Sequence, residues 1–70
     1  MKTPGTEIGA FVRERRKARG WTQQALADYA GVGRRFVVEL ELGKPGVQMD
    51  AVQRVLRLFG KRVGLVDIDA

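Results

Sequence analysis

The 70-residue sequence contains no cysteine, no histidine and no serine. Without cysteine it can form neither a disulfide nor a thiolate metal site. Without histidine and serine, the Ser-His-Asp and Cys-His catalytic arrangements and most zinc sites are also excluded. Glu39 and Glu41 lie two residues apart on one predicted helix and do not face each other, so they form no carboxylate pair. We therefore expect no catalysis, no metal and no cofactor.

Long hydrophobic runs are also missing. No stretch approaches the roughly 18 consecutive apolar residues of a membrane-spanning helix, and residues 1–5 carry no apolar core of a signal peptide. We expect a soluble protein in the bacterial cytoplasm, of bacterial or phage origin and associated with the nucleoid. A single domain of this length buries only about 60% of its unfolded surface. With no disulfide or metal to support it, a second copy of the chain is the expected support.

Acidic residues are in the minority, with 8 Asp and Glu against 13 Lys and Arg, for a net charge of +5. Residues 1–46 carry nine basic and five acidic side chains, which leaves +4 of the +5 in this part of the chain. At 30% charged and 44% hydrophobic residues, the composition is that of a globular domain. A compact basic domain points to a polyanionic partner, nucleic acid first.

Glycines separate the chain into segments of helical length. We predict four helices, which run from Thr6 to Gly20, from Gln23 to Ala30, from Gly33 to Gly43 and from Met49 to Gly60. Apolar residues of the last helix follow helical spacing and are expected in the core: Met49, Val52, Val55, Leu56 and Phe59. The fold class is therefore all-α, with four short helices in a domain over residues 6–60 and a flexible arm over residues 1–5.

Residues 61–70 form a tail whose composition favours a short β-strand from Arg62 to Ile68. A single strand has no partner within the chain, so we predict that it pairs with the same strand of a second copy in a homodimer. The residues expected to dimerise are Val63, Leu65 and Val66. The alternative is a frayed C-terminal end.

The second and third predicted helices are joined by a tight glycine turn at Gly31, with small Ala27 allowing the two helices to approach closely. This is helix-turn-helix geometry, in which the second helix enters the major groove of DNA. The segment resembles the Cro and phage-repressor (Xre-type) family over about Ile8 to Phe59. The matching residues are Val12, Arg16, Gly20 to Gln23, Leu26, Ala27, Gly31, Val32, Val37, Leu40, Glu41, Gly43 and Lys44. The ending after Gly60 resembles HipB-type antitoxins in particular.

The resemblance implies roles for individual residues. Side chains at the start of the third helix meet base edges, and those expected to read bases are Arg34, Arg35, Val38 and Glu39. The arginines could instead contact phosphate. The residues expected to bind phosphate are Thr22, Gln23 and Lys44. The run from Arg13 to Arg19 either faces the DNA backbone or is a solvated helix face.

Arg16 and Glu41 commonly pair in the resembling family, so a structural salt bridge is expected there rather than contact with DNA. Three positions depart from the family pattern. Gly33 replaces a capping Ser or Thr, Phe36 is large for the start of a base-reading helix, and Leu42 replaces a commonly polar residue. These departures affect the details of base contact and not the fold.

The resemblance implies a dimeric, sequence-specific repressor that binds double-stranded operator DNA. A HipB-type antitoxin with a HipA-like kinase toxin as partner is compatible with repression, and its toxin-facing patch would include Leu42, Val47 or Leu58. A third possibility is a protein-interaction adaptor that has kept the fold without binding DNA, although the presence of Gln23, Arg34 and Arg35 argues against it.

Overall fold

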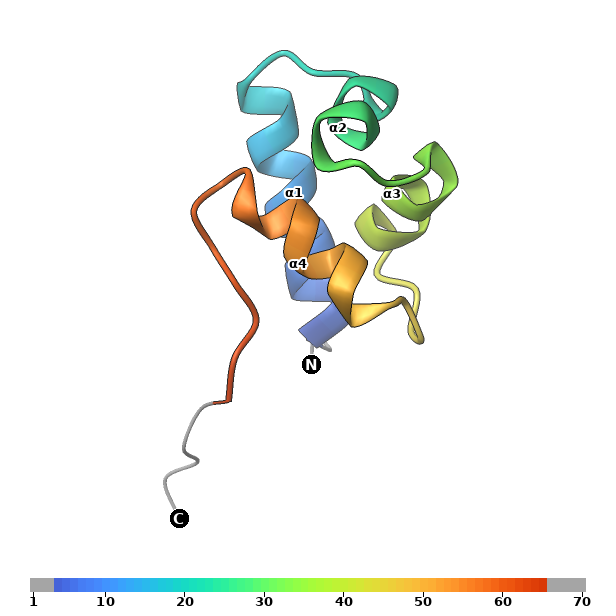
Figure 1. The fold of residues 1–70 in the computed structure, drawn as a ribbon, viewed down its shortest axis with the longest axis vertical. Helices are drawn as coiled ribbons and strands as arrows, with labels where there is room; N and C mark the ends of the chain where they lie inside the picture. Colours follow the sequence, from blue (N-terminus) through green and yellow to red (C-terminus); the bar gives the residue numbers. More distant parts are fainter. Residues whose placement is uncertain (1–3, 66–70) are drawn as a thin grey trace.

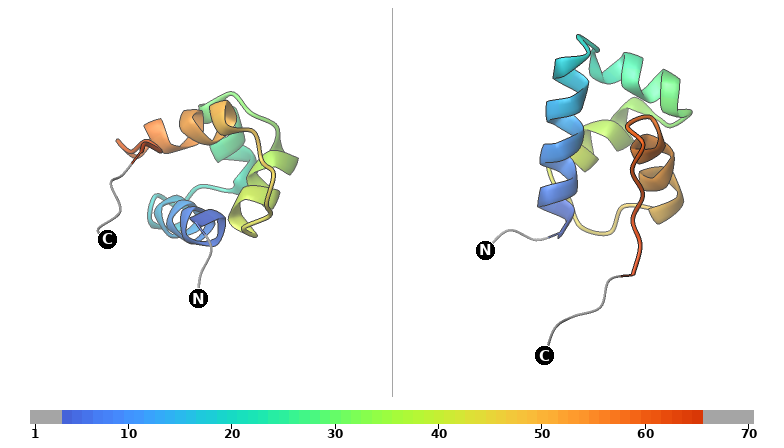
Figure 2. Two further views of the ribbon diagram at one scale, coloured as in Figure 1. Left: turned by 90° about the horizontal axis from the view of Figure 1, so that it is seen from below. Right: turned by 90° about the vertical axis from the view of Figure 1, so that its left-hand side faces the viewer.

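The computed structural model describes residues 4–65, which form four α-helices. The helices are α1 (Pro4–Ala18), α2 (Gln23–Ala30), α3 (Arg34–Glu41) and α4 (Met49–Arg57). In Figure 1, α1 runs along one side, α2 and α3 lie beside it, and α4 crosses in front. Figure 2 shows the helices grouped around one centre, which their apolar side chains fill. The prediction of an all-α fold with four helices is confirmed.

Both ends of α2, including the turn into α3, form as their residues predict. The Thr22 hydroxyl caps α2 by accepting a hydrogen bond from the Ala25 backbone N–H at 3.0 Å. Helix α2 ends at Gly31, whose φ of 72° is a left-handed conformation that glycine adopts without a steric penalty. The next N–H, from Val32, donates to the Ala27 carbonyl at 3.0 Å. Only residues 31–33 separate the two helices, so the chain turns sharply from α2 into α3.

The predicted start of the first helix is wrong by two residues. Helix α1 begins at Pro4, and Thr6 therefore lies inside its first turn rather than at the N-cap. Proline is compatible with the first turn of a helix, because the N–H that it lacks would have no partner within the helix there. The helix consequently extends further toward the N-terminus than a start at Thr6.

One hydrophobic core joins α1 to the other three helices. Its buried residues are Val12, Leu26, Ala27, Val37, Leu40, Val52, Val55 and Leu56. Met49 was expected in this core, but 55% of its surface is exposed. It is the first residue of α4 and lies beside the exposed loop at Pro45 and Gly46, where no helix covers it.

The described part of the tail, residues 61–65, forms neither helix nor strand. The strand predicted from Arg62 is thus not found as far as Leu65, since a lone extended segment has no neighbouring strand to bond; Val66 to Ile68 lie outside the described residues. Gln53 of α4 nevertheless binds this segment. Its side-chain amide donates to the Val63 carbonyl and accepts from the Val63 N–H, both at 2.9 Å. The tail therefore runs back along α4 toward the end of the molecule where α1 begins (Figure 1).

Helix α1 packs closely against the end of α3 at Gly9. A Cβ atom at this position would collide with the Leu40 carbonyl oxygen and would lie 3.0 Å from the Glu41 carbonyl oxygen. Both are backbone atoms, which cannot move without shifting α3. The absence of a side chain at Gly9 therefore sets the distance between α1 and α3.

Replacing Gly9 with Ala tests this contact, because helix propensity and packing predict changes of opposite sign in the free energy of unfolding. Helix propensity alone predicts that the change stabilises α1 by about 0.5–1 kcal/mol. We expect instead that Gly9→Ala lowers the free energy of unfolding by about 1–3 kcal/mol, because the added methyl group overpacks the α1–α3 contact. Urea denaturation measures the difference. At the neighbouring exposed Ala10, the opposite change Ala10→Gly should also destabilise, and a Gly9→Ala protein as stable as the natural chain would contradict the assignment.

Candidate nucleic-acid interface

Helix α3 has one face in the core and one face toward solvent. Val37 and Leu40 are buried, whereas Arg34 and Arg35 in its first turn are exposed. Val38 and Glu39, one turn later on the outward side, are half-buried. The four residues predicted to read bases therefore lie on the part of α3 that is turned away from the core.

The N-terminal end of α3 is open and positively polarised. Gly33 is its N-cap and makes no side-chain capping bond, and a Cβ at this position would meet no atom within 4 Å. The first backbone N–H groups of a helix lack partners within it, and the helix dipole adds to their positive potential. With the Arg34 and Arg35 guanidinium groups beside it, this end of α3 is suited to an anionic partner.

A buried ion pair fixes the other end of α3 to α1. Arg16 Nε donates to Glu41 Oε2 at 2.7 Å, and Arg16 Nη2 donates to Glu41 Oε1 at 3.0 Å. The two side chains are only 11% and 4% exposed. The hydrogen bond to Glu41 raises the pKa of Arg16, which opposes the effect of its burial. The structure thus places Arg16 and Glu41 in the structural pairing that the sequence analysis expected.

The same ion pair binds the start of α2. Arg16 Nη1 donates to the Trp21 carbonyl at 2.8 Å, and Gln23 Nε2 donates to Glu41 Oε1 at 3.3 Å. Gln23, expected to bind phosphate, is half-buried and bonded within the protein. The Thr22 hydroxyl, also expected at phosphate, caps α2. Glu41 therefore positions Gln23, whereas the Thr22 side chain is held by its capping bond to Ala25.

A polar hollow of about 340 Å³ lies where α1, α2 and α3 meet. It is lined by Arg13, Arg16, Gln23, Val38, Glu41 and Leu42. Arg13 belongs to the basic run of α1 and was not singled out in the sequence analysis. Its spacing was the available signal, because it lies three residues before Arg16 and so shares a helix face with it.

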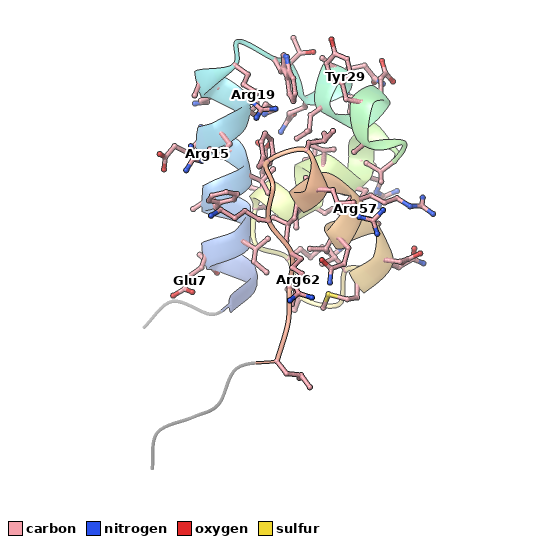
Figure 3. The ribbon with its side chains drawn as sticks, turned by 60° about the vertical axis from the view of Figure 1, so that its left-hand side comes forward. Glu7, Arg15, Arg19, Tyr29, Arg57 and Arg62 are labelled. Atoms are coloured by element: carbon pink, nitrogen blue, oxygen red, sulfur yellow. The ribbon has the colours of Figure 1, made fainter. Side chains whose placement is uncertain are left out.

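The basic run of α1 is divided between two faces of the helix. Arg13 and Arg16 line the hollow beside α3. Arg15 lies over the Phe11 ring at 5.2 Å, and Arg19 lies over the Trp21 and Phe59 rings at 5.0 and 4.8 Å. Figure 3 shows Arg15 and Arg19 on α1, viewed from the side on which α4 and the tail lie in front of α3. The run therefore contributes to two faces of α1, and its contact with the DNA backbone stays a prediction.

Glu39 carries two ion pairs on the outward side of α3. Arg35 Nε and Lys44 Nζ each donate to Glu39 Oε1 at 3.2 Å. The hydrogen bond from Lys44 lowers the pKa of Glu39, and the bond from Arg35 lowers it further. Three residues predicted to contact DNA separately are therefore connected to one another in the free protein.

This arrangement is a helix-turn-helix whose second helix begins with two exposed arginines, and sequence comparison assigns the chain to a family of that kind. The helix-turn-helix family matches residues 12–66, and the chain belongs to this family. It is 46% identical over 66 residues to an uncharacterised HTH-type transcriptional regulator, y4mF, of Sinorhizobium fredii; the match covers 94% of this chain and 86% of the relative.

Two further relatives are more distant. A competence pilus inhibition repressor of Acinetobacter baylyi is 33% identical over 60 residues, which cover 86% of this chain and 54% of that protein. An uncharacterised HTH-type transcriptional regulator of Methanothermobacter thermautotrophicus is 36% identical over 51 residues, or 73% of this chain and 74% of the relative. The chain is thus a DNA-binding regulator by family and not an enzyme.

Two features are absent from residues 4–65. None of the helices in this part of the chain is long and apolar enough to cross a membrane. The same residues contain no cluster of three or more acidic side chains arranged to hold a metal ion.

Removing one partner of the Arg16–Glu41 pair should destabilise the domain. Glu41→Gln leaves the buried Arg16 charge uncompensated, so we expect it to lower the free energy of unfolding by about 3 kcal/mol. A domain of this size has roughly 4–10 kcal/mol in total. Urea denaturation followed by circular dichroism gives the value, with Arg35→Met as a control that removes an exposed ion pair worth at most about 1 kcal/mol. Equal effects of the two variants would show that the buried pair has no special role.

Proposed function

We propose that this protein is a sequence-specific transcriptional repressor that inserts α3 into the major groove of operator DNA. The observation that carries the proposal is the outward face of α3, where Arg34 and Arg35 are exposed beside an open helix N-terminus. A helix about 10–12 Å across fits a groove about 12 Å wide. The buried Arg16–Glu41 pair supports it by holding α3 at a fixed angle to α1.

The arginines suit base contact by their chemistry. An exposed guanidinium group can donate two parallel hydrogen bonds to guanine O6 and N7. The exposure of Arg34 at the first position of α3 supports this role. Val38, partly exposed one turn later, offers an apolar contact to a thymine methyl group, and Glu39 an acceptor for a base amine.

Phosphate contacts would come from groups around α3. Lys44 is 57% exposed at its side chain and follows the end of α3. Thr22 and Gln23 lie at the N-terminus of α2, where backbone N–H groups favour an anion. Arg13 joins them because it lines the same hollow as Gln23. These contacts would set the orientation of the domain on the duplex.

Repression would follow from occupancy of a promoter, including that of the protein's own gene. The named relative that acts as a repressor, the competence pilus inhibition protein, is similar to this chain over 60 residues. Binding by α3 would compete with RNA polymerase for the same DNA, which requires no chemistry in the protein.

A homodimer would place two copies of α3 in successive major grooves, about 34–36 Å apart on a palindromic operator. The tail supports this arrangement. Gln53 bonds both backbone groups of Val63, and Leu65 is fully exposed. In an extended chain, alternate residues direct their backbone groups to opposite edges. The edge at Gly64 therefore faces away from Gln53, and we propose that it pairs with the tail of a second copy, with Val66 contributing beyond the described residues.

An antitoxin role with a HipA-like kinase partner is the second candidate, and it rests on the HipB-type resemblance. Of the three residues considered for a toxin-facing patch, Val47 and Leu58 pack against the core, whereas Leu42 is 78% exposed. Leu42 lines the hollow shared with Arg13 and Val38, so it belongs to the side proposed for DNA. Relief by this protein of the toxicity of a kinase encoded beside its gene would support the second role.

Loss of the two arginines should abolish specific binding. The duplexes are the region upstream of this protein's gene, the best sequence from a random duplex library, and a scrambled control. We expect a Kd of roughly 10⁻⁸ M or tighter for specific DNA. Each of Arg34→Ala and Arg35→Ala should weaken specific binding by about 1–3 kcal/mol. Arg15→Ala removes the same charge from the α4 side and should weaken binding to all duplexes slightly and equally.

The outcomes separate the alternatives. Binding without preference over scrambled DNA, with a steep salt dependence, would mean general affinity for polyanions and contradict the proposal. No binding to any duplex would favour the adaptor hypothesis. Specific binding to the selected sequence but not to the upstream region would mean that the protein represses other genes and not its own.

The dimer proposal is tested by shortening the tail. A variant without residues 63–70 should be a monomer at micromolar concentration and should bind the palindromic operator at least tenfold more weakly, because the two half-sites are no longer linked. Light scattering after size-exclusion chromatography gives the mass. Gly64→Pro is the finer variant, since it removes one backbone N–H from the edge turned away from Gln53. A truncated protein that remains dimeric would exclude pairing through the tail.

A further inference from the structure

Glu39 is an acidic residue on a surface that is otherwise suited to DNA. Its carboxylate lies between Arg35 and Lys44, and both cations donate to the same oxygen, Oε1, at 3.2 Å. Neither of these two ion pairs uses Oε2. A carboxylate in this position needs an explanation, because it repels the phosphates that its neighbours attract.

The three side chains differ in their exposure to solvent. The Arg35 and Lys44 side chains are 90% and 57% exposed, whereas that of Glu39 is 27% exposed. The two cations can therefore turn away toward phosphate by rotating their long side chains. Glu39 is shorter and more enclosed on α3, so it would stay directed at the base edges after the cations have moved.

We propose that Glu39 is a specificity-determining residue, which withholds Arg35 and Lys44 from DNA phosphates unless the groove offers its carboxylate a base amine. This inference rests on the proposed insertion of α3 into the major groove. Cytosine N4 and adenine N6 are the amine donors exposed there. On other sequences the carboxylate faces acceptors and phosphates, so moving the two cations away from it is unfavourable.

The consequence is a penalty that falls mainly on non-specific DNA. In the free protein, Glu39 and its two cations have a net charge of +1 rather than +2. Glu39→Gln would release both cations and raise the net charge of the chain from +5 to +6. Each added phosphate contact steepens the dependence of log affinity on log salt by about 0.9.

The experiment measures affinity for the selected operator and for scrambled DNA across a salt series, using the full-length chain. For Glu39→Gln we expect roughly tenfold tighter binding to scrambled DNA, with a salt slope steeper by about one to two. We also expect the preference for the operator to fall by tenfold or more. Glu14→Gln is the matched control, because it makes the same change of charge at an exposed position of α1. It should change both affinities by the same small factor.

A second variant tests whether the steeper salt slope comes from the release of Arg35 and Lys44 or only from the gain of one positive charge. Adding Lys44→Met to Glu39→Gln should cancel about half of the increase in salt slope, since one of the two released cations is then missing. Thermal unfolding of each variant checks that the domain remains folded at the temperature of the assay.

Several results would overturn the inference. If Glu39→Gln changes the affinity for both duplexes by the same factor as Glu14→Gln, Glu39 acts only through its charge. If Glu39→Gln fails to tighten binding to scrambled DNA, the cations are not withheld. Absence of binding to any duplex would overturn the inference together with the proposed function. If the natural chain binds DNA without preference, the proposed function fails and Glu39 determines no specificity, and the salt slopes then decide only whether Glu39 withholds its two cations. If the natural chain prefers its operator and Glu39→Gln keeps that preference, the inference alone fails.

Discussion

The arrangement of this domain depends on one buried ion pair. Arg16 and Glu41 join α1 to the last residue of α3, and through the Trp21 carbonyl and Gln23 the same two side chains also bind the start of α2. A buried pair often adds little net stability, because the loss of hydration offsets its attraction. Its contribution here is geometric: a guanidinium group that donates to both carboxylate oxygens allows one orientation, and that orientation sets which face of α3 is turned outward.

Features that depend on neighbouring residues were predictable from the sequence. The Thr22 cap, the left-handed Gly31 and the short α2 follow from local rules, and each is found in the structure. The close approach at Gly9 was not predictable, because it depends on carbonyl groups more than thirty residues away in sequence. The bond between Gln53 and Val63 is of the same kind. Local patterns fix where helices begin and end, but the contacts between them depend on which surfaces meet.

The candidate site divides in the same way. The outward position of Arg34 and Arg35 follows from helical periodicity once Val37 and Leu40 are placed in the core. The pairing of Arg16 with Glu41 came from resemblance to a family, since no local rule connects residues 25 positions apart. The link between Arg35 and Glu39 was open to prediction from their spacing of four, whereas the addition of Lys44 depends on the path of the loop after α3.

Net charge alone is a poor guide to the surface that binds DNA. Arg15 and Arg19 increase the positive charge of the chain, but they lie on aromatic rings on the side of α4, where Arg19 also donates to the Leu58 carbonyl. On the outward side of α3, an acidic residue offsets part of the basic charge. Long-range attraction depends on the sum of all these charges, whereas sequence preference depends on the few that reach base edges. A helix-turn-helix domain can therefore be attracted to any DNA and still distinguish one site, provided that some of its cations are already engaged within the protein.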